Sequence, residues 1–269
     1  EEAQTLIIYM KDQVTGLQVE LLYGVLPEYD VITRSAKVIN TEEDKIRLTK
    51  AQAACIDFLH GEFDVISFYG RHAMERNMQR TSVGHGAFVI GSRRGTSSHQ
   101  YNPMMILAEK ETTEDAGTCY GMSFVYSGGF KAEVEKDQFG QTRMQMGLQE
   151  EQFSYPLEKG QEFVIPEVIL TCSNQGLGKL SQNLQRCIRK NLCRGKYKEK
   201  VRPVLINSWE ACYFDFTGED IYHLAEQAKD LGIDMVVLDD GWFGSRNDDN
   251  SGLGDWKVNE EKLQGSLGD

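Results

Sequence analysis

Two adjacent aspartates, Asp239 and Asp240, stand at the end of a short apolar run and lead into a glycine and a tryptophan. Adjacent carboxylates are poorly arranged to act as nucleophile and general acid in retaining glycoside hydrolysis, because those groups lie about 5 to 5.5 Å apart on separate positions. An ionised carboxylate accepts hydrogen bonds from two donors at once, and neighbouring sugar hydroxyls present donors at that spacing. The pair could instead cap the following turn or bind a cation such as Mg²⁺ or Ca²⁺. The residue types favour sugar binding and leave both alternatives open.

Trp209 ends an earlier apolar run, as the acidic pair ends the later one. Because Trp209 and the acidic pair both follow apolar runs, we expect the Trp209 ring to line the same site as Asp239 and Asp240. The alternative is a core aromatic packed under the long loop that follows. We expect Trp242 and Trp256 to be packing residues.

A polar loop at residues 93–99 contains two arginines, three hydroxyl side chains and the imidazole of His99. A histidine beside a serine suggests nucleophilic catalysis, but that chemistry needs a third group that orients the base. The sequence shows no such group near this loop. We therefore expect residues 93–99 to form turns or a contact between domains.

The residues around the three candidate side chains predict a β-α-β unit. Residues 203–207 and 234–238 are near-continuous apolar runs, typical of parallel strands that are buried on both faces. Between them, Thr217 and Asp220 form a capping box at the start of a helix that Gly232 ends. Parallel α/β folds keep their sites in the long loops after the strands, which is where the candidate residues lie.

The first part of the chain is rich in predicted strands. Short runs of alternating polarity, separated by turn residues, occur at 5–10, 17–26, 29–40, 86–92, 104–108, 119–126, 131–135, 142–148 and 161–170. They predict a sandwich of antiparallel sheets. Apolar residues at helical spacing predict a helix over 177–192, followed by a basic linker at 194–202. The domains expected are a β domain at 1–176, a linker helix and linker at 177–200, and an α/β part at 201–269.

Composition excludes several classes of protein. The chain has 269 residues, 40% of them hydrophobic, with no run long enough for a transmembrane helix. Its formal charge of −12 would repel nucleic acid and anionic lipid, so neither is an expected partner. Six cysteines without C-x-x-C spacing predict reduced thiols in a cytoplasmic protein and no structural zinc site. The chain opens on Glu1 without a visible signal peptide, and we expect both ends to be truncated.

Several motifs carry a resemblance to a known family. They are RPVLINSWEACYFDF at residues 202–216, LDDGWFG at 238–244 and LGDW at 253–256, with upstream segments EYDVITR at 28–34, RGTSSH at 94–99 and YSGGF at 126–130. Together they resemble the α-galactosidases of glycoside hydrolase family 36. The resemblance implies an antiparallel β-supersandwich followed by the first two strands of a (β/α)8 TIM barrel. It also implies hydrolysis of terminal α-galactosyl groups with retention of configuration, on oligosaccharides such as raffinose and melibiose.

Carried over by position, the resemblance makes Asp239 and Asp240 the acidic pair that holds galactose hydroxyls, and Trp209 an aromatic wall of that pocket. The family's nucleophile lies in a Lys-x-Asp motif on a later barrel strand, and its acid/base lies further on, so no residue here is assigned as catalytic. Ser208 and Cys212 depart from the asparagine and threonine common in the family.

The resemblance implies no metal and no cofactor, and it implies a homo-tetramer for the parent protein. A non-catalytic carbohydrate-binding β-module and a galactosyl-transferring member of the family are the alternatives. The presence of Lys-x-Asp in further strand–helix units would separate the enzyme from the module.

Overall fold

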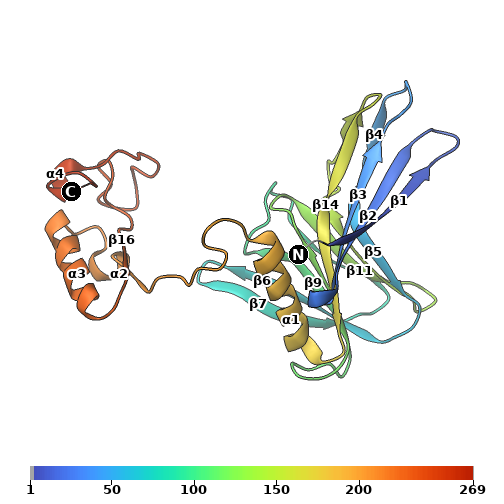
Figure 1. Ribbon diagram of the computed structural model, residues 1–269, viewed down its shortest axis with the longest axis horizontal. Helices are drawn as coiled ribbons and strands as arrows, with labels where there is room; N and C mark the ends of the chain where they lie inside the picture. Colours follow the sequence, from blue (N-terminus) through green and yellow to red (C-terminus); the bar gives the residue numbers. More distant parts are fainter. Residues whose placement is uncertain (1–2, 269) are drawn as a thin grey trace. The chain divides into compact units, whose positions relative to one another are not determined.

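The computed structural model describes residues 3–268 (Figure 1). The chain divides into two compact units, Glu1–Cys193 and Arg194–Asp269, which we describe separately. Within the described residues, no helix has the length and apolar character needed to span a membrane.

The first unit is built from antiparallel sheets, as the sequence predicts. Its large sheet has the order β1 (Gln4–Lys11), β2 (Gln18–Leu26), β3 (Val31–Ile39), β14 (Glu162–Ser173), β10 (Cys119–Phe124), β9 (Tyr101–Glu109), β6 (Phe63–Arg71) and β7 (Met74–Ser82). The second sheet has the order β5 (Gln52–Phe58), β12 (Thr142–Leu148), β11 (Phe130–Lys136) and β8 (Gly86–Gly91). A small pair joins β13 (Tyr155–Leu157) to β4 (Ile46–Leu48), and a 3₁₀ turn at Pro27–Tyr29 precedes β3.

The central strands of the large sheet are buried on both faces. Along β9, Met105 and Leu107 belong to the core cluster that also contains Phe130 and Met144 of the second sheet. Ile106, between them in sequence, belongs to a second cluster on the opposite face. Because side chains alternate across a strand, a strand with core on both sides loses the polar–apolar alternation of a surface strand.

Helix α1 (Gly176–Cys187) covers that opposite face (Figure 1). Leu180, Leu184 and Cys187 are buried in the second cluster, and a π-helical turn at Ile188–Leu192 continues the helix. The helix predicted at 177–192 is therefore present. It packs within the first unit, which differs from the linker role that the sequence suggested for residues 177–200.

Three longer strands were absent from the predicted runs, namely β5, β6 and β7. Strand β6 begins with five buried residues in a row, and these include the polar Asp64 and Ser67. Strand β7 is an edge strand made mostly of exposed polar residues. Neither has the alternating pattern from which the other strands were predicted.

The second unit contains the predicted parallel β-α-β arrangement. Strand β15 (Leu205–Asn207) pairs in parallel with β16 (Met235–Val237), and helix α3 (Gly218–Asp230) connects them. The capping box is confirmed: the Asp220 amide donates to Thr217 Oγ1, and the Thr217 amide donates to the Asp220 carboxylate. Both strands are shorter than predicted. Trp209 opens the short helix α2 (Trp209–Cys212), and a further short helix, α4, spans Glu260–Leu263.

The buried carboxylate of Asp64, with its ion-pair partners, gives the first unit a testable pH dependence. Asp64 of β6 accepts hydrogen bonds from Arg80 at 2.7 Å, Lys110 at 2.5 Å and Ser82 at 3.0 Å. Burial opposes ionisation of Asp64, but these hydrogen bonds outweigh it and hold its pKa below the ordinary value. In the unfolded chain an aspartate has a pKa of about 3.9, and in the folded protein the pKa of Asp64 is lower. The ionised Asp64 therefore stabilises the fold at any pH above about 3.9. This stabilisation is lost as the pH falls through the folded-state pKa.

We therefore predict that Asp64→Asn lowers the free energy of unfolding by about 1.5 to 3 kcal/mol at pH 7. The difference from wild type should shrink as the pH is lowered below about 4. Urea denaturation across this pH range measures both. As a control, Asp57→Asn removes a half-exposed partner of Arg143 and should cost only about 0.2 to 1 kcal/mol. An equal effect of the two substitutions, or no pH dependence, would contradict the prediction.

Protease sensitivity should distinguish the two units. The second unit leaves Val204, Leu205 and Met235 at 60%, 52% and 44% exposure, whereas the first unit has two buried clusters. We predict that trypsin cleaves first within 194–202 or beyond it, and leaves a stable fragment that ends near Leu192. Mass spectrometry of a digestion time course identifies the cut sites. Equal protection of residues 203–242 would contradict this prediction.

Candidate functional site

The carboxyl ends of β15 and β16 meet at one edge, because the two strands run in parallel. The Ser208 amide donates to the Val237 carbonyl at 3.0 Å, and the Asp239 amide donates to Ser208 Oγ at 3.1 Å. Asn207 Nδ2 donates to Asp239 Oδ2 at 2.7 Å. The residues that follow the two strands are thus joined directly by hydrogen bonds.

Asn207 also connects Trp209 to this edge. Its Oδ1 accepts from the Trp209 amide at 2.8 Å, while its Nδ2 holds Asp239. The partly buried indole of Trp209 makes edge-on contacts with the rings of Tyr213 and Phe214, with centroids 5.2 and 4.8 Å away. The structure therefore brings Trp209 and the acidic pair to one edge, with Trp209 at the start of α2 and not at a strand end.

Asp240 has one engaged oxygen and one open oxygen. Its Oδ1 accepts from the Gly241 amide at 2.8 Å and from Arg246 Nε at 2.6 Å. No residue in the described part of the chain donates a hydrogen bond to Oδ2. The Arg246 guanidinium, followed by the Gly241 amide, holds the pKa of Asp240 below its ordinary value. Asp240 therefore offers an ionised acceptor with one oxygen fixed in place.

Each aspartate of the pair also accepts a hydrogen bond from the backbone amide of the next residue. Asp239 Oδ1 accepts from the Asp240 amide at 2.8 Å, just as Asp240 Oδ1 accepts from the Gly241 amide. A carboxylate has about four acceptor sites, so these bonds leave capacity for a ligand. In residues 3–268 no group of three or more His, Cys, Asp or Glu side chains is arranged to hold a metal ion.

Arg246 was not identified from the sequence as a functional residue. Its side chain is only 6% exposed, and Nη1 donates to the backbone carbonyls of Asp248 at 3.2 Å and Ser251 at 2.7 Å. Its guanidinium lies 5.6 Å from the centroid of the Phe214 ring. Its only signal in the sequence is its position six residues after Asp240, within the same loop.

Lys262 of α4 forms a second link between the loops. Its Nζ donates to the Phe214 carbonyl at 2.6 Å and to Asn247 Oδ1 at 3.3 Å, and lies 4.4 Å from the Phe216 ring centroid. Desolvation lowers its pKa. These residues line a cavity of about 560 Å³, but Trp209 and the acidic pair do not line it.

Trp242 takes the packing role that the sequence predicts, whereas Trp256 is 68% exposed. Both rings contact Phe243, which is almost fully buried, with centroids 5.1 and 4.6 Å away. They stabilise the loop that follows the acidic pair.

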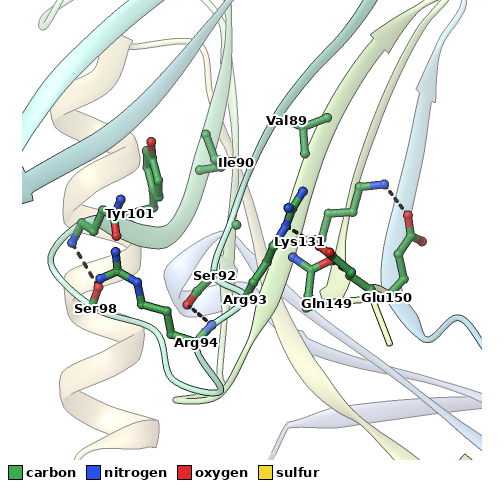
Figure 2. Close-up of a pocket in the computed structure, with 13 residues that line it drawn as sticks. Val89, Ile90, Ser92, Arg93, Arg94, Ser98, Tyr101, Lys131, Gln149 and Glu150 are labelled. Carbon is green, nitrogen blue, oxygen red and sulfur yellow. Dashed lines mark hydrogen bonds and ion pairs between the residues drawn. The ribbon is translucent and has the colours of Figure 1, made fainter. Parts of the chain in front are cut away.

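The arginine-rich loop at 93–99 lines a cavity of about 800 Å³ in the first unit (Figure 2). Arg93 pairs with Glu151 at 2.5 Å, and Lys131 pairs with Glu150 at 2.6 Å, so opposite charges largely cancel in the cavity wall. Ser92 Oγ accepts from the Arg94 amide at 3.4 Å, a bond that Figure 2 shows. Residues 94–96 of this loop form a bend, and a turn begins at His99.

Two family models match the chain. Residues 1–158 match the glycosyl hydrolase family 36 N-terminal domain, and residues 162–269 match the melibiase family. The observed antiparallel sandwich and parallel β-α-β unit agree with the sandwich and the start of the barrel that the sequence predicts.

Curated and solved relatives agree with these matches. The bifunctional alpha-galactosidase/sucrose kinase AgaSK of Mediterraneibacter gnavus is 64% identical over 99% of this chain and 29% of its own length. Alpha-galactosidase Mel36A of Lactobacillus acidophilus is 46% identical over 100% of this chain and 37% of its own length.

The crystal structure of alpha-galactosidase AgaA from Geobacillus stearothermophilus superposes with a TM-score of 0.94 at 44% identity, over 99% of this chain and 37% of that chain. The chain thus spans about a third of the length of the relatives it matches. By both family models, the chain belongs to glycoside hydrolase family 36.

Proposed function

We propose that this chain is part of an α-galactosidase that hydrolyses terminal α-galactosyl residues with retention of configuration. The observation that carries the proposal is the acidic pair at the carboxyl edge of β16, where Asp240 is ionised and keeps Oδ2 open. The match to the glycosyl hydrolase family 36 N-terminal domain and to the melibiase family supports this proposal. In the proposed role, Asp239 and Asp240 accept hydrogen bonds from galactosyl hydroxyls.

The chemistry of the sugar fits these acceptors. Adjacent hydroxyls on a pyranose ring can rotate so that both donate to one carboxylate, and a charged acceptor shortens and strengthens each bond. An ionised Asp240 makes such bonds without changing its protonation state. Trp209 supplies an apolar wall against which the sugar's C–H groups pack, with its ring already fixed by Tyr213 and Phe214.

Sugar binding by these residues does not by itself break the glycosidic bond. Retaining hydrolysis needs a carboxylate nucleophile and an acid/base about 5 to 5.5 Å apart. We assign neither role within these 269 residues. In the proposal, both come from later strands of a complete (β/α)8 barrel, to which β15 and β16 contribute two neighbouring strands.

The proposed substrates are α-galactoside oligosaccharides such as raffinose and melibiose. Solved complexes of AgaA variants from Geobacillus stearothermophilus contain raffinose and stachyose, which supports this substrate class. A homo-tetrameric assembly and a cytoplasmic location remain parts of the proposal. The six cysteines, all present as free thiols, are consistent with a reducing compartment.

The binding role predicts a specific loss on substitution. In the active enzyme that carries this sequence, Asp240→Asn keeps the size of the side chain and removes its charge. The kcat/KM for a nitrophenyl α-galactoside should fall by an amount that corresponds to about 1.5 to 3 kcal/mol. Asp234→Asn is the matched control, because Asp234 precedes the same strand at its opposite end and is exposed. An Asp240→Asn enzyme with the kcat/KM of the control would contradict the proposed role.

The assignment of catalytic groups predicts that the purified 269-residue chain releases no nitrophenol from the same α-galactoside. Without a nucleophile, the binding groups alone cannot form the covalent intermediate of a double displacement. The release rate should equal that of a heat-treated sample. Turnover above that background would mean that these residues contain a nucleophile, and would overturn the assignment.

A further inference from the structure

We infer that Arg246 is a positioning residue for sugar binding, which fixes the Asp240 carboxylate so that Oδ1 is occupied and Oδ2 is left for a hydroxyl. The inference rests on the proposed function and adds to it a residue that does not itself bind the sugar. It starts from the 2.6 Å hydrogen bond between Arg246 Nε and Asp240 Oδ1.

The guanidinium has a separate anchor on each of its sides. Nε holds the carboxylate, Nη1 donates to the carbonyls of Asp248 and Ser251, and Nη2 lies 3.6 Å from Asp249. The planar fork of an arginine can make these contacts together, whereas the single ammonium of a lysine cannot. The loop carbonyls therefore fix the guanidinium, and the guanidinium fixes Asp240.

Arg246 also supports the aromatic wall. Its guanidinium lies over the Phe214 ring, whose centroid is 4.8 Å from that of Trp209. A cation over an aromatic face is attracted to it, and the attraction grows as solvent is excluded. One buried side chain thus contacts Asp240 directly and Trp209 through Phe214.

The charges around Asp240 determine how its ionisation responds to a substitution. Arg246 and the more distant Lys262 favour the ionised form, and Asp239 is its neighbour along the chain. Asp248 and Asp249 face the guanidinium, and Asp215 faces Lys262. Because Arg246 is the largest influence that lowers the pKa of Asp240, its removal raises that pKa.

A double-mutant cycle of Arg246→Met and Asp240→Asn in the active enzyme tests the inference. Arg246→Met should lower kcat/KM for a nitrophenyl α-galactoside by roughly 10- to 100-fold. Asp240→Asn should have a loss of similar size. The double variant should lose much less than the product of the two single losses, because the main effect of Arg246 passes through the carboxylate that is already lost. Losses that multiply in the double variant would overturn the inference.

The pH profile gives a readout that a purely structural role would not change. Arg246→Met should move the acidic limb of kcat/KM to higher pH, because Asp240 then protonates more readily. Arg246→Lys keeps the positive charge but lacks the planar guanidinium with its several N–H donors. The acidic limb of its kcat/KM profile should therefore stay near that of wild type, while kcat/KM falls several-fold. Arg143→Met removes a half-exposed arginine that pairs with Asp57 in the first unit, and should match wild type in both respects.

Thermal unfolding of each variant identifies any loss of fold. If Arg246→Met does not fold, Arg246→Lys replaces it in the cycle, and non-additive losses with Asp240→Asn again support the inference. A wild-type kcat/KM for Arg246→Lys overturns it. Reduced activity of Asp240→Asn with full activity of Arg246→Met overturns this inference alone, whereas full activity of Asp240→Asn removes the proposed sugar-binding role of Asp240 as well.

Discussion

The hydrogen-bonded ion pair between Arg246 and Asp240 organises the candidate site, because it joins the loop after β16 to the carboxylate at the end of that strand. The described part of the second unit buries few large hydrophobic side chains, among them Phe216 and Phe243. Polar contacts must therefore supply much of the geometry. A mostly buried guanidinium that lost its carboxylate would remain charged in a poorly solvated place, so each partner constrains the other.

Parallel strand pairing explains why this network forms where it does. The registered pairing of β15 with β16 brings Asn207, Ser208 and Asp239 together, although the first two are more than 30 residues from the third in sequence. Asn207 then uses both ends of its amide, one for Asp239 and one for the Trp209 backbone. The first unit follows a different principle, since its large sheet carries one apolar cluster on each face.

Much of this organisation could be predicted from local sequence signals. The capping box at Thr217, the two apolar runs and the acidic pair each specify a structure within a few residues, and the parallel unit was predicted correctly. Strands such as β6 and β7 were missed because one is buried on both faces and the other is a polar edge. Arg246 and Lys262 were missed for another reason: a basic residue in a loop reads as solvated until the fold shows what encloses it.

A crystal structure of the active enzyme with bound galactose would test the central claim most directly. The claim is that Asp239 and Asp240 bind the sugar, and that Arg246 fixes the Asp240 carboxylate for this role. The account predicts a galactose hydroxyl within about 2.5 to 3.0 Å of Asp240 Oδ2, with Arg246 Nε still on Oδ1. Galactose bound without contact to either aspartate would contradict the account. A complex in which Asp240 has left Arg246 to reach the sugar would contradict it as well.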